Sequence, residues 1–141
     1  MSIHSNAFGD PSANGTETFS LVGTGTAAQL RNLVQNEMIS AWGLTNRGNK
    51  TANFAVLRDT AAPAVLHELA FITNAPDAQK LGSPTERQKA AVAHLRAIQR
   101  HYNIAPYVPG TPTQPAGEGT ITARVLDDLG PVAGATVELD D

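Results

Sequence analysis

The sequence predicts an α/β domain with a mostly parallel, twisted β-sheet flanked by helices, followed by a proline-rich linker and the start of a β-sandwich-like module. Residues 64–72 are almost wholly apolar, which is typical of a central strand covered on both faces. Residues 26–42 carry apolar side chains at three- and four-residue steps, the period of a helix with one buried side. Beyond residue 103, prolines spaced by glycine, threonine and glutamine favour an extended segment without a core.

The first elements are expected to be two strands and a helix. Residues 1–7 are half apolar and precede a segment dense in turn residues, so we expect a strand end that leads into a loop. Residues 16–22 alternate between polar and apolar side chains, the pattern of a half-buried strand. The helix over 26–42 is expected to bury one stripe and to end at Gly43. That stripe consists of Leu30, Leu33, Val34, Met38, Ile39 and Trp42.

The second half of the domain is expected to hold the central strand and a last helix. Pro63 can open the strand 64–72 but cannot lie within it. Ser83 is a good helix N-cap, because proline follows it and Glu86 can reach back as a capping-box partner. The buried stripe of this helix is predicted to be Ala91, Leu95, Ile98 and Tyr102.

Three regions follow from these patterns. Residues 1–103 form the α/β domain, 104–118 the linker, and 119–141 an incomplete module. In the last region, 119–126 and 135–139 alternate as strands do, with a turn between them. Because two strands do not make a stable sandwich, we expect them to be the opening hairpin of a larger unit.

Composition excludes several classes of function. The net charge of −3 and the absence of a basic patch argue against nucleic acid as a partner. The chain has no cysteine, so a metal would have to be held by histidine or carboxylate side chains. No segment approaches the roughly 20 apolar residues of a membrane span.

Two candidate chemical residues lie on predicted strands. His4 shares one face of a strand with Asn6 and could be a metal ligand, although a lone histidine near a terminus is most often an ordinary surface or capping residue. Glu68 interrupts the apolar strand, and carboxylates are rarely buried unless they are paired or bind a cation. The alternative for Glu68 is a solvent-facing position or a pair with Arg58.

The remaining polar residues are expected to be structural. His67 must point away from the face that Glu68 occupies, so we assign it to packing. His94 and His101 lie seven residues apart on the last helix and are predicted to be surface residues. Arg58 and Asp59 are expected to form a local ion pair. Thr16 and Glu17 could border a binding groove or form a solvated strand edge.

Five segments in this order resemble the catalytic domain of the zinc-dependent N-acetylmuramoyl-L-alanine amidases, the cell-wall hydrolases with an Amidase_3-type domain. The resemblance covers roughly residues 1–102. The matching segments are Ser2-Ile-His4-Ser-Asn6-Ala, Asn14-Gly-Thr-Glu17-Thr, the stretch from Gly43 to Gly48, the stretch from Phe54 to Thr60, and the stretch from Pro63 to Asn74.

The resemblance implies a function and a set of roles. His4 matches a zinc ligand, Glu68 matches the catalytic glutamate, and Asn6, Thr16 and Glu17 are weaker candidates for substrate binding. The expected reaction cleaves the peptidoglycan amide bond between N-acetylmuramic acid and L-alanine of the stem peptide, in an extracellular, periplasmic or cell-wall location.

The resemblance covers only the C-terminal portion of the family's domain. It therefore implies an N-terminally truncated domain whose other zinc ligands lie upstream of Met1, and a chain that is inactive by itself. The alternative is a fragment that binds the cell wall without cutting it, or one that is inactive.

Overall fold

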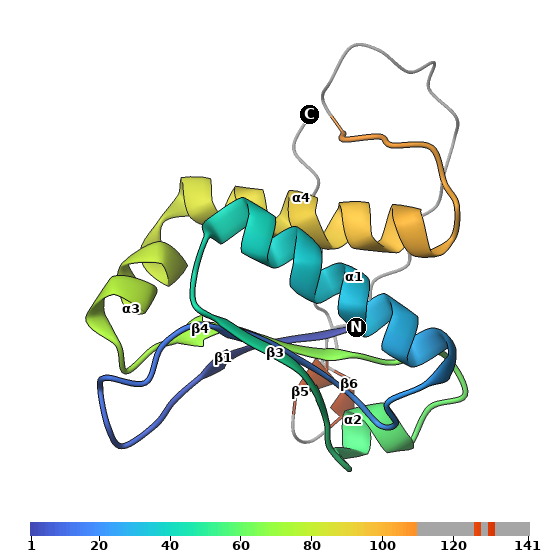
Figure 1. The fold of residues 1–141 in the computed structure, drawn as a ribbon, viewed down its shortest axis with the longest axis horizontal. Helices are drawn as coiled ribbons and strands as arrows, with labels where there is room; N and C mark the ends of the chain where they lie inside the picture. Colours follow the sequence, from blue (N-terminus) through green and yellow to red (C-terminus); the bar gives the residue numbers. More distant parts are fainter. Residues whose placement is uncertain (110–125, 128–129, 132–141) are drawn as a thin grey trace. The chain divides into compact units, whose positions relative to one another are not determined.

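The computed structural model describes residues 1–109, 126–127 and 130–131, and the chain divides into two compact units, Met1–Pro106 and Tyr107–Asp141. The first unit contains four strands and four helices, which alternate along much of the chain (Figure 1). In chain order they are β1 (Ser2–Asn6), β2 (Thr16–Ser20), α1 (Gly25–Trp42), β3 (Asn46–Thr51), α2 (Ala55–Arg58), β4 (Leu66–Phe71), α3 (Ala75–Gly82) and α4 (Pro84–His101).

The four strands form one sheet in the order β1-β4-β2-β3. β1 pairs with β4 in parallel, β2 pairs with β3 in parallel, and β2 and β4 are antiparallel. This confirms the predicted α/β class with a mostly parallel sheet. The strand predicted over 64–72 is β4, which has a neighbour on each side, as expected of a central strand.

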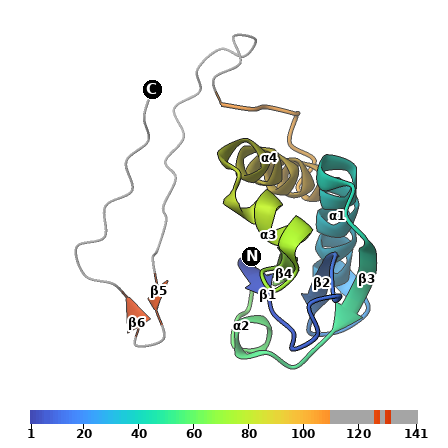
Figure 2. The ribbon, with the colours of Figure 1, turned by 90° about the vertical axis from the view of Figure 1, so that its left-hand side faces the viewer.

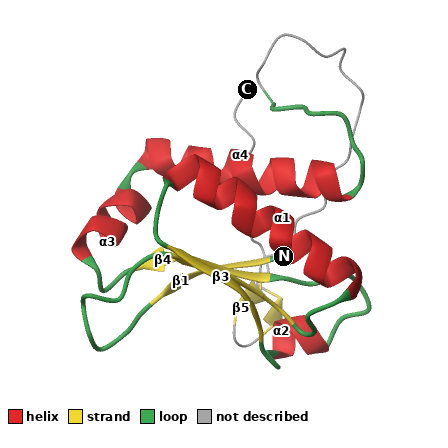
Figure 3. Ribbon diagram, viewed as in Figure 1, coloured by secondary structure: helices red, strands yellow, loops and turns green. Residues whose placement is uncertain are grey.

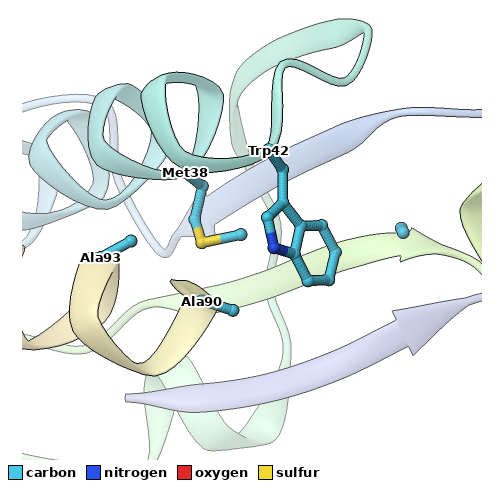
Figure 4. Packing of buried hydrophobic residues seen from close by; sticks show 5 residues of the cluster. Met38, Trp42, Ala90 and Ala93 are labelled. Carbon is cyan, nitrogen blue, oxygen red and sulfur yellow. The ribbon is translucent and has the colours of Figure 1, made fainter. Parts of the chain in front are cut away.

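α1 and α4 pack against each other along one face of the sheet (Figures 2 and 3). Met38 and Trp42 of α1 meet Ala70 of β4 and the small residues Ala90 and Ala93 of α4 (Figure 4). A second cluster joins Leu30, Val34, Val65 and Ala97. Each large side chain that is fully buried here stabilises the fold by about 1.5–3 kcal/mol. We call this side of the sheet the helix-covered face and the other side the open face.

Both predicted helix boundaries are confirmed. Gly43 adopts a left-handed conformation (φ 62°), and its N–H donates to the carbonyl of Ile39, so α1 ends where the sequence predicted. Ser83 accepts a hydrogen bond from the backbone N–H of Glu86 at the start of α4. The second half of the expected capping box does not form, because the Ser83 N–H donates to the Lys80 carbonyl and the Glu86 carboxylate pairs with lysines instead.

Three expectations about burial were wrong. The buried side of α4 consists of Ala90, Ala93, His94, Ala97 and Gln99, whereas Ala91 and Tyr102 are exposed. His94 is therefore not a surface residue, because α4 turns its alanines, and this histidine with them, toward the interior. The strand β2 is almost wholly buried rather than half-buried, since it lies between β3 and β4.

Little of the second unit is described. Leu126–Asp127 (β5) and Gly130–Pro131 (β6) form a short antiparallel pair. The predicted strand over 135–139, most of the strand over 119–126 and linker residues 110–118 lie outside the described residues. Within the part of the chain that is described, no helix is both long and apolar enough to cross a lipid bilayer.

Candidate active site

His4, Glu17 and Glu68 come from three adjacent strands and meet on the open face. Glu68 on β4 is the register partner of His4 on β1 and of Glu17 on β2. Side chains of register partners lie side by side on the same face of a sheet. The flanking residues Thr16 and His67 hydrogen-bond on the helix-covered face, so the alternation along each strand places the three residues on the other. The prediction that His67 and Glu68 face opposite sides is confirmed.

His4 is exposed at this edge of the sheet. Its Nε2 lies 2.8 Å from the hydroxyl oxygen of Ser2, one side chain farther back along the same face. This single exposed contact leaves the imidazole accessible, and an accessible imidazole can bind a metal cation.

Glu68 is half-buried, and its Oε2 is a buried atom without a hydrogen-bond partner among the described residues. Burial raises the pKa of this carboxyl, the charge of His4 lowers it, and the charge of Glu17 raises it further, so that the net direction is upward. An upward shift brings the pKa of a carboxyl closer to the range that general acid–base catalysis uses. The predicted alternative, a Glu68–Arg58 pair, is wrong, because Arg58 forms the expected ion pair with Asp59 at 2.8 Å.

Glu17 is buried, with 4% of its surface exposed, and its carboxylate is fully engaged. Asn6 donates to Oε1 at 3.0 Å, while Arg47 and Lys50 both donate to Oε2, at 2.8 and 2.5 Å. Burial alone would raise the pKa of Glu17, but the hydrogen bonds and charges of Lys50 and Arg47 outweigh it and hold the pKa below its usual range. The interpretation of Glu17 as a solvated strand edge is therefore wrong.

Thr16 is not brought to the open face. It is fully buried, and its hydroxyl lies 2.7 Å from Nε2 of His67. His67 Nδ1 lies 2.7 Å from Nε2 of His94, whose Nδ1 lies 2.7 Å from the Ala90 carbonyl. Since that carbonyl can only accept, His94 donates to Ala90, His67 donates to His94, and Nε2 of His67 accepts from the Thr16 hydroxyl. The Thr16 hydroxyl oxygen also lies 3.1 Å from the Glu68 carbonyl oxygen, and its single proton is then directed to His67. Burial, with a smaller contribution from the charge of His94, lowers the pKa of His67 to about 3, so both rings are neutral.

Sequence reasoning missed three residues that shape the site. Arg47 and Lys50 lie on β3, in a polar stretch that gave no strand signal. Asp77 is buried, and its Oδ2 accepts from the backbone N–H groups of Gly15 and Phe71, at 2.8 and 3.0 Å. It thereby ties the start of β2 to the end of β4. The pattern Asn74-Ala-Pro-Asp77, an N-cap with an acid three residues later, was a usable signal for α3 and for this residue.

The open face carries part of a donor set for a metal ion. His4 offers an imidazole and Glu68 a buried oxygen without a partner, both of which are chemically suited to zinc. Among residues 1–109, 126–127 and 130–131, however, no group of three histidine, aspartate or glutamate side chains gathers around one point. The described residues thus fit a part of a zinc site and do not complete one.

A mixed sheet covered by helices on one face, with an imidazole beside a carboxylate of raised pKa on the other, defines an α/β domain with a candidate acid–base site. Residues 1–100 match the Amidase_3 family, described as N-acetylmuramoyl-L-alanine amidase, and the chain belongs to this family.

Curated relatives agree with this assignment. The chain is 38% identical over 106 residues to N-acetylmuramoyl-L-alanine amidase CwlM of Bacillus licheniformis, which covers 74% of this chain and 41% of CwlM. It is 40% identical over 95 residues to amidase LytC of Bacillus subtilis, which covers 66% of this chain and 19% of LytC. The chain therefore spans less than half the length of these two relatives.

Solved structures share the fold. The catalytic domain of CwlV, an amidase from Bacillus (Paenibacillus) polymyxa var. colistinus, superposes with a TM-score of 0.68 at 30% identity, covering 73% of this chain and 56% of that one. An N-acetylmuramoyl-L-alanine amidase from Clostridium difficile 630 gives the same TM-score at 27% identity, covering 72% and 55%.

Proposed function

We propose that this chain is part of a peptidoglycan hydrolase that cleaves the amide bond between N-acetylmuramic acid and L-alanine of the stem peptide. The observation that carries the proposal is the pairing of His4 with Glu68 on the open face, in a chain that belongs to the amidase family. Acyl-transfer to water at an amide needs a base for the water and an acid for the departing nitrogen. A carboxyl with a raised pKa can supply both in turn.

We assign these proton transfers to Glu68. Its carboxylate takes the proton of the attacking water, and the resulting carboxylic acid then gives a proton to the nitrogen of L-alanine as the C–N bond breaks. The upward shift of the Glu68 pKa favours the protonated carboxylic acid that this second step needs. Oε2, which has no hydrogen-bond partner among the described residues, is the oxygen that can take up and release the proton.

We propose zinc as the cofactor, with His4 as one of its ligands. When bound, zinc would polarise the amide carbonyl and lower the pKa of a water molecule. A catalytic zinc usually has three protein ligands, so at least two donors besides His4 are required, and the described residues do not supply them. Asn6 lies two residues from His4 on β1 and donates a hydrogen bond to Glu17 on β2, which holds the end of the strand that carries His4.

The place of action is proposed from the relatives. Two of them are named cell wall amidases, from Staphylococcus epidermidis and from Bacillus anthracis. Because peptidoglycan lies outside the plasma membrane, we propose an extracellular, periplasmic or cell-wall-associated location for this protein as well.

The chemical identity of the product tests the proposal. The full-length protein that contains this chain is incubated with purified peptidoglycan, and the new amino termini are identified by mass spectrometry. We expect stem peptides that begin with free L-alanine, and intact glycan strands. New reducing ends would contradict the proposal, because they would mean that a glycan bond had been cut. Co-sedimentation of the protein with peptidoglycan without any product would also contradict it, and would favour a binding role.

A matched pair of histidine variants tests the role of His4. His4→Ala is expected to lower the bound zinc, measured by elemental analysis, and the release of L-alanine termini together. His101→Ala removes the same side chain from the end of α4 and is expected to change neither. Full zinc content in His4→Ala would remove His4 from the ligand set.

A further inference from the structure

We propose that Arg47 and Lys50 of β3, anchored by the buried carboxylate of Glu17, form a recognition site for a carboxylate group in the peptide portion of the substrate. The identity of that peptide rests on the proposed function. The existence of a carboxylate site rests on the geometry of these three side chains.

One buried carboxylate anchors both cations at the same atom. Arg47 Nε and Lys50 Nζ both donate to Oε2 of Glu17, and Asn6 satisfies Oε1. A single cation together with Asn6 would already satisfy and neutralise this carboxylate. The second cation is therefore in excess, and the group Glu17–Arg47–Lys50 carries a net charge of +1 on the open face.

The two cations retain donors for a ligand. A guanidinium has five N–H donors, of which Arg47 directs one to Glu17 and one to the Asn14 carbonyl at 3.4 Å. An ammonium group has three, of which Lys50 directs one to Glu17. Their side chains keep 34% and 38% of their surface exposed, whereas that of Glu17 keeps 6%. The anchor is thus hidden from solvent while both cations are accessible.

Aromatic rings hold the cations in place. The guanidinium carbon of Arg47 lies 4.8 Å from the centroid of the Phe71 ring, and Lys50 Nζ lies 5.7 Å from that of Phe19. Long basic side chains normally lose considerable entropy when they order around a ligand. A pair that is already fixed by a carboxylate and two rings avoids much of this cost, and a planar guanidinium beside an ammonium suits a carboxylate ligand.

The site lies at a useful distance from Glu68. Glu17 is the register partner of Glu68, and β3 is the next strand beyond β2. Neighbouring strands are about 4.8 Å apart, so the backbone of β3 lies about 10 Å from that of β4. The charged groups lie nearer to β4, because both reach back over β2 to Oε2 of Glu17 and the guanidinium carbon of Arg47 lies 4.8 Å from the ring centroid of Phe71 on β4. A peptide whose first amide bond lies at Glu68 would therefore bring a carboxylate of its second or third residue to Arg47 and Lys50.

Two synthetic ligands test this inference by binding. One is N-acetylmuramoyl-L-alanine extended by two further residues with free carboxylates, and the other is the same molecule with those carboxylates converted to carboxamides. Affinities of the full-length protein for both are measured by calorimetry at one salt concentration. We expect the free acid to bind at least about tenfold more tightly, a preference that added salt reduces.

Variants separate recognition from a structural role. Arg47→Gln and Lys50→Gln are each expected to bring the two affinities within about twofold of each other. Lys89→Gln removes an exposed lysine on α4 and should leave the preference unchanged. If the two cations only neutralised Glu17, both ligands would weaken equally in the variants and the ratio would persist, which would overturn the proposal. If Arg47→Gln does not fold, Lys50→Gln alone decides.

The same ligands distinguish failure of this inference from failure of the proposed function. Cleavage of both compounds at equal rates and with equal affinities would refute carboxylate recognition and leave the amidase reaction intact. A preference for the free acid without cleavage of either compound would support the recognition site and refute the reaction.

Discussion

His67 and His4 lie on neighbouring strands of one sheet, and the face that each occupies decides its chemistry. His67 points into the helix-covered face, is fully buried, and has both ring nitrogens engaged by Thr16 and His94. His4 points into the open face and is exposed, and within the described residues its ring hydrogen-bonds only to Ser2. The carboxylates follow the same division: Asp77 is buried with two backbone donors, whereas Glu68 keeps an oxygen without a described partner.

Hydrogen bonds of the polar side chains stabilise the covered face, as those of Glu17 do on the open face, and we propose that His4 and Glu68 serve the chemistry. On the covered face, every polar group named above has a partner in a neighbouring helix or strand, so removing one leaves others unsatisfied. On the open face, neither His4 nor Glu68 has a side-chain hydrogen bond to a neighbouring helix or strand among the described residues, so their removal should affect the proposed reaction more than the fold.

The largest expected difference is between the two histidines themselves. His67→Ala should lower the free energy of unfolding by about 3–4 kcal/mol, because it opens a cavity and leaves Thr16 and His94 without their partner. His4→Ala should change it by less than about 0.5 kcal/mol. Urea unfolding followed by circular dichroism measures both. Equal losses would show that the two faces do not differ in this way.

The pH dependence of stability should also come from the covered face. The pKa of His67 is about 3 in the folded chain and close to 6.5 when unfolded, so below pH 6.5 the unfolded state binds more protons. Above pH 6.5, His67 should leave the free energy of unfolding unchanged. Below that pH, its contribution should lower the free energy of unfolding by up to about 1.4 kcal/mol per pH unit toward pH 3, or by about 2 kcal/mol between pH 6 and 4.5.

His67→Gln provides the control for this pH effect. It lacks the titrating group, so its stability should fall less steeply between pH 6 and 4.5 than that of the parent chain. Parallel pH profiles would show that His67 does not contribute to the acid lability.

A smaller effect is expected for the hydroxyl that ends this hydrogen-bond chain. Thr16→Val keeps the shape of the side chain but leaves Nε2 of His67 without a donor, which should cost about 1–2 kcal/mol in urea unfolding. Ser2→Ala removes the hydroxyl beside His4 on the open face and should cost almost nothing. A neutral Thr16→Val would show that His67 does not depend on the Thr16 hydroxyl for a partner.

The smallest effect should have the opposite sign. The raised pKa of Glu68 means that its charge destabilises the fold near neutral pH, so Glu68→Gln should leave stability unchanged or raise it by less than about 1 kcal/mol. Thermal unfolding at pH 7 measures this. A loss of stability would indicate that the Glu68 carboxylate has a structural partner.

Much of the fold followed from local patterns. The three- and four-residue period gave α1, Gly43 and Ser83 gave helix ends, and the apolar run gave β4. β3 was missed because its sequence Asn46–Thr51 has no apolar alternation; its side chains are held by Glu17 on the neighbouring strand, a contact between distant parts of the chain.

The site was predictable in part. Alternation along β4 correctly predicted that His67 and Glu68 face opposite sides of the sheet. His4, which was singled out on the first strand, lies on the strand that pairs with β4. The burial of His94 was missed because α4 packs alanines against α1, and alanine gives a weak hydrophobic signal. The engagement of Glu17 depends on Arg47 and Lys50, which no local pattern connects to it. The roles of His4, Asn6, Thr16, Glu17 and Glu68 in catalysis or binding, and the boundaries of the linker and second module, stay predictions.

The most direct test of the account is the rate at which the Glu68→Gln variant of the full-length protein releases L-alanine amino termini from peptidoglycan. With zinc content and melting temperature equal to those of the parent protein, we expect the rate to fall by about 10²–10⁴-fold. A rate within threefold of the parent would contradict the assignment of proton transfer to Glu68 and, with it, the open face as the catalytic surface.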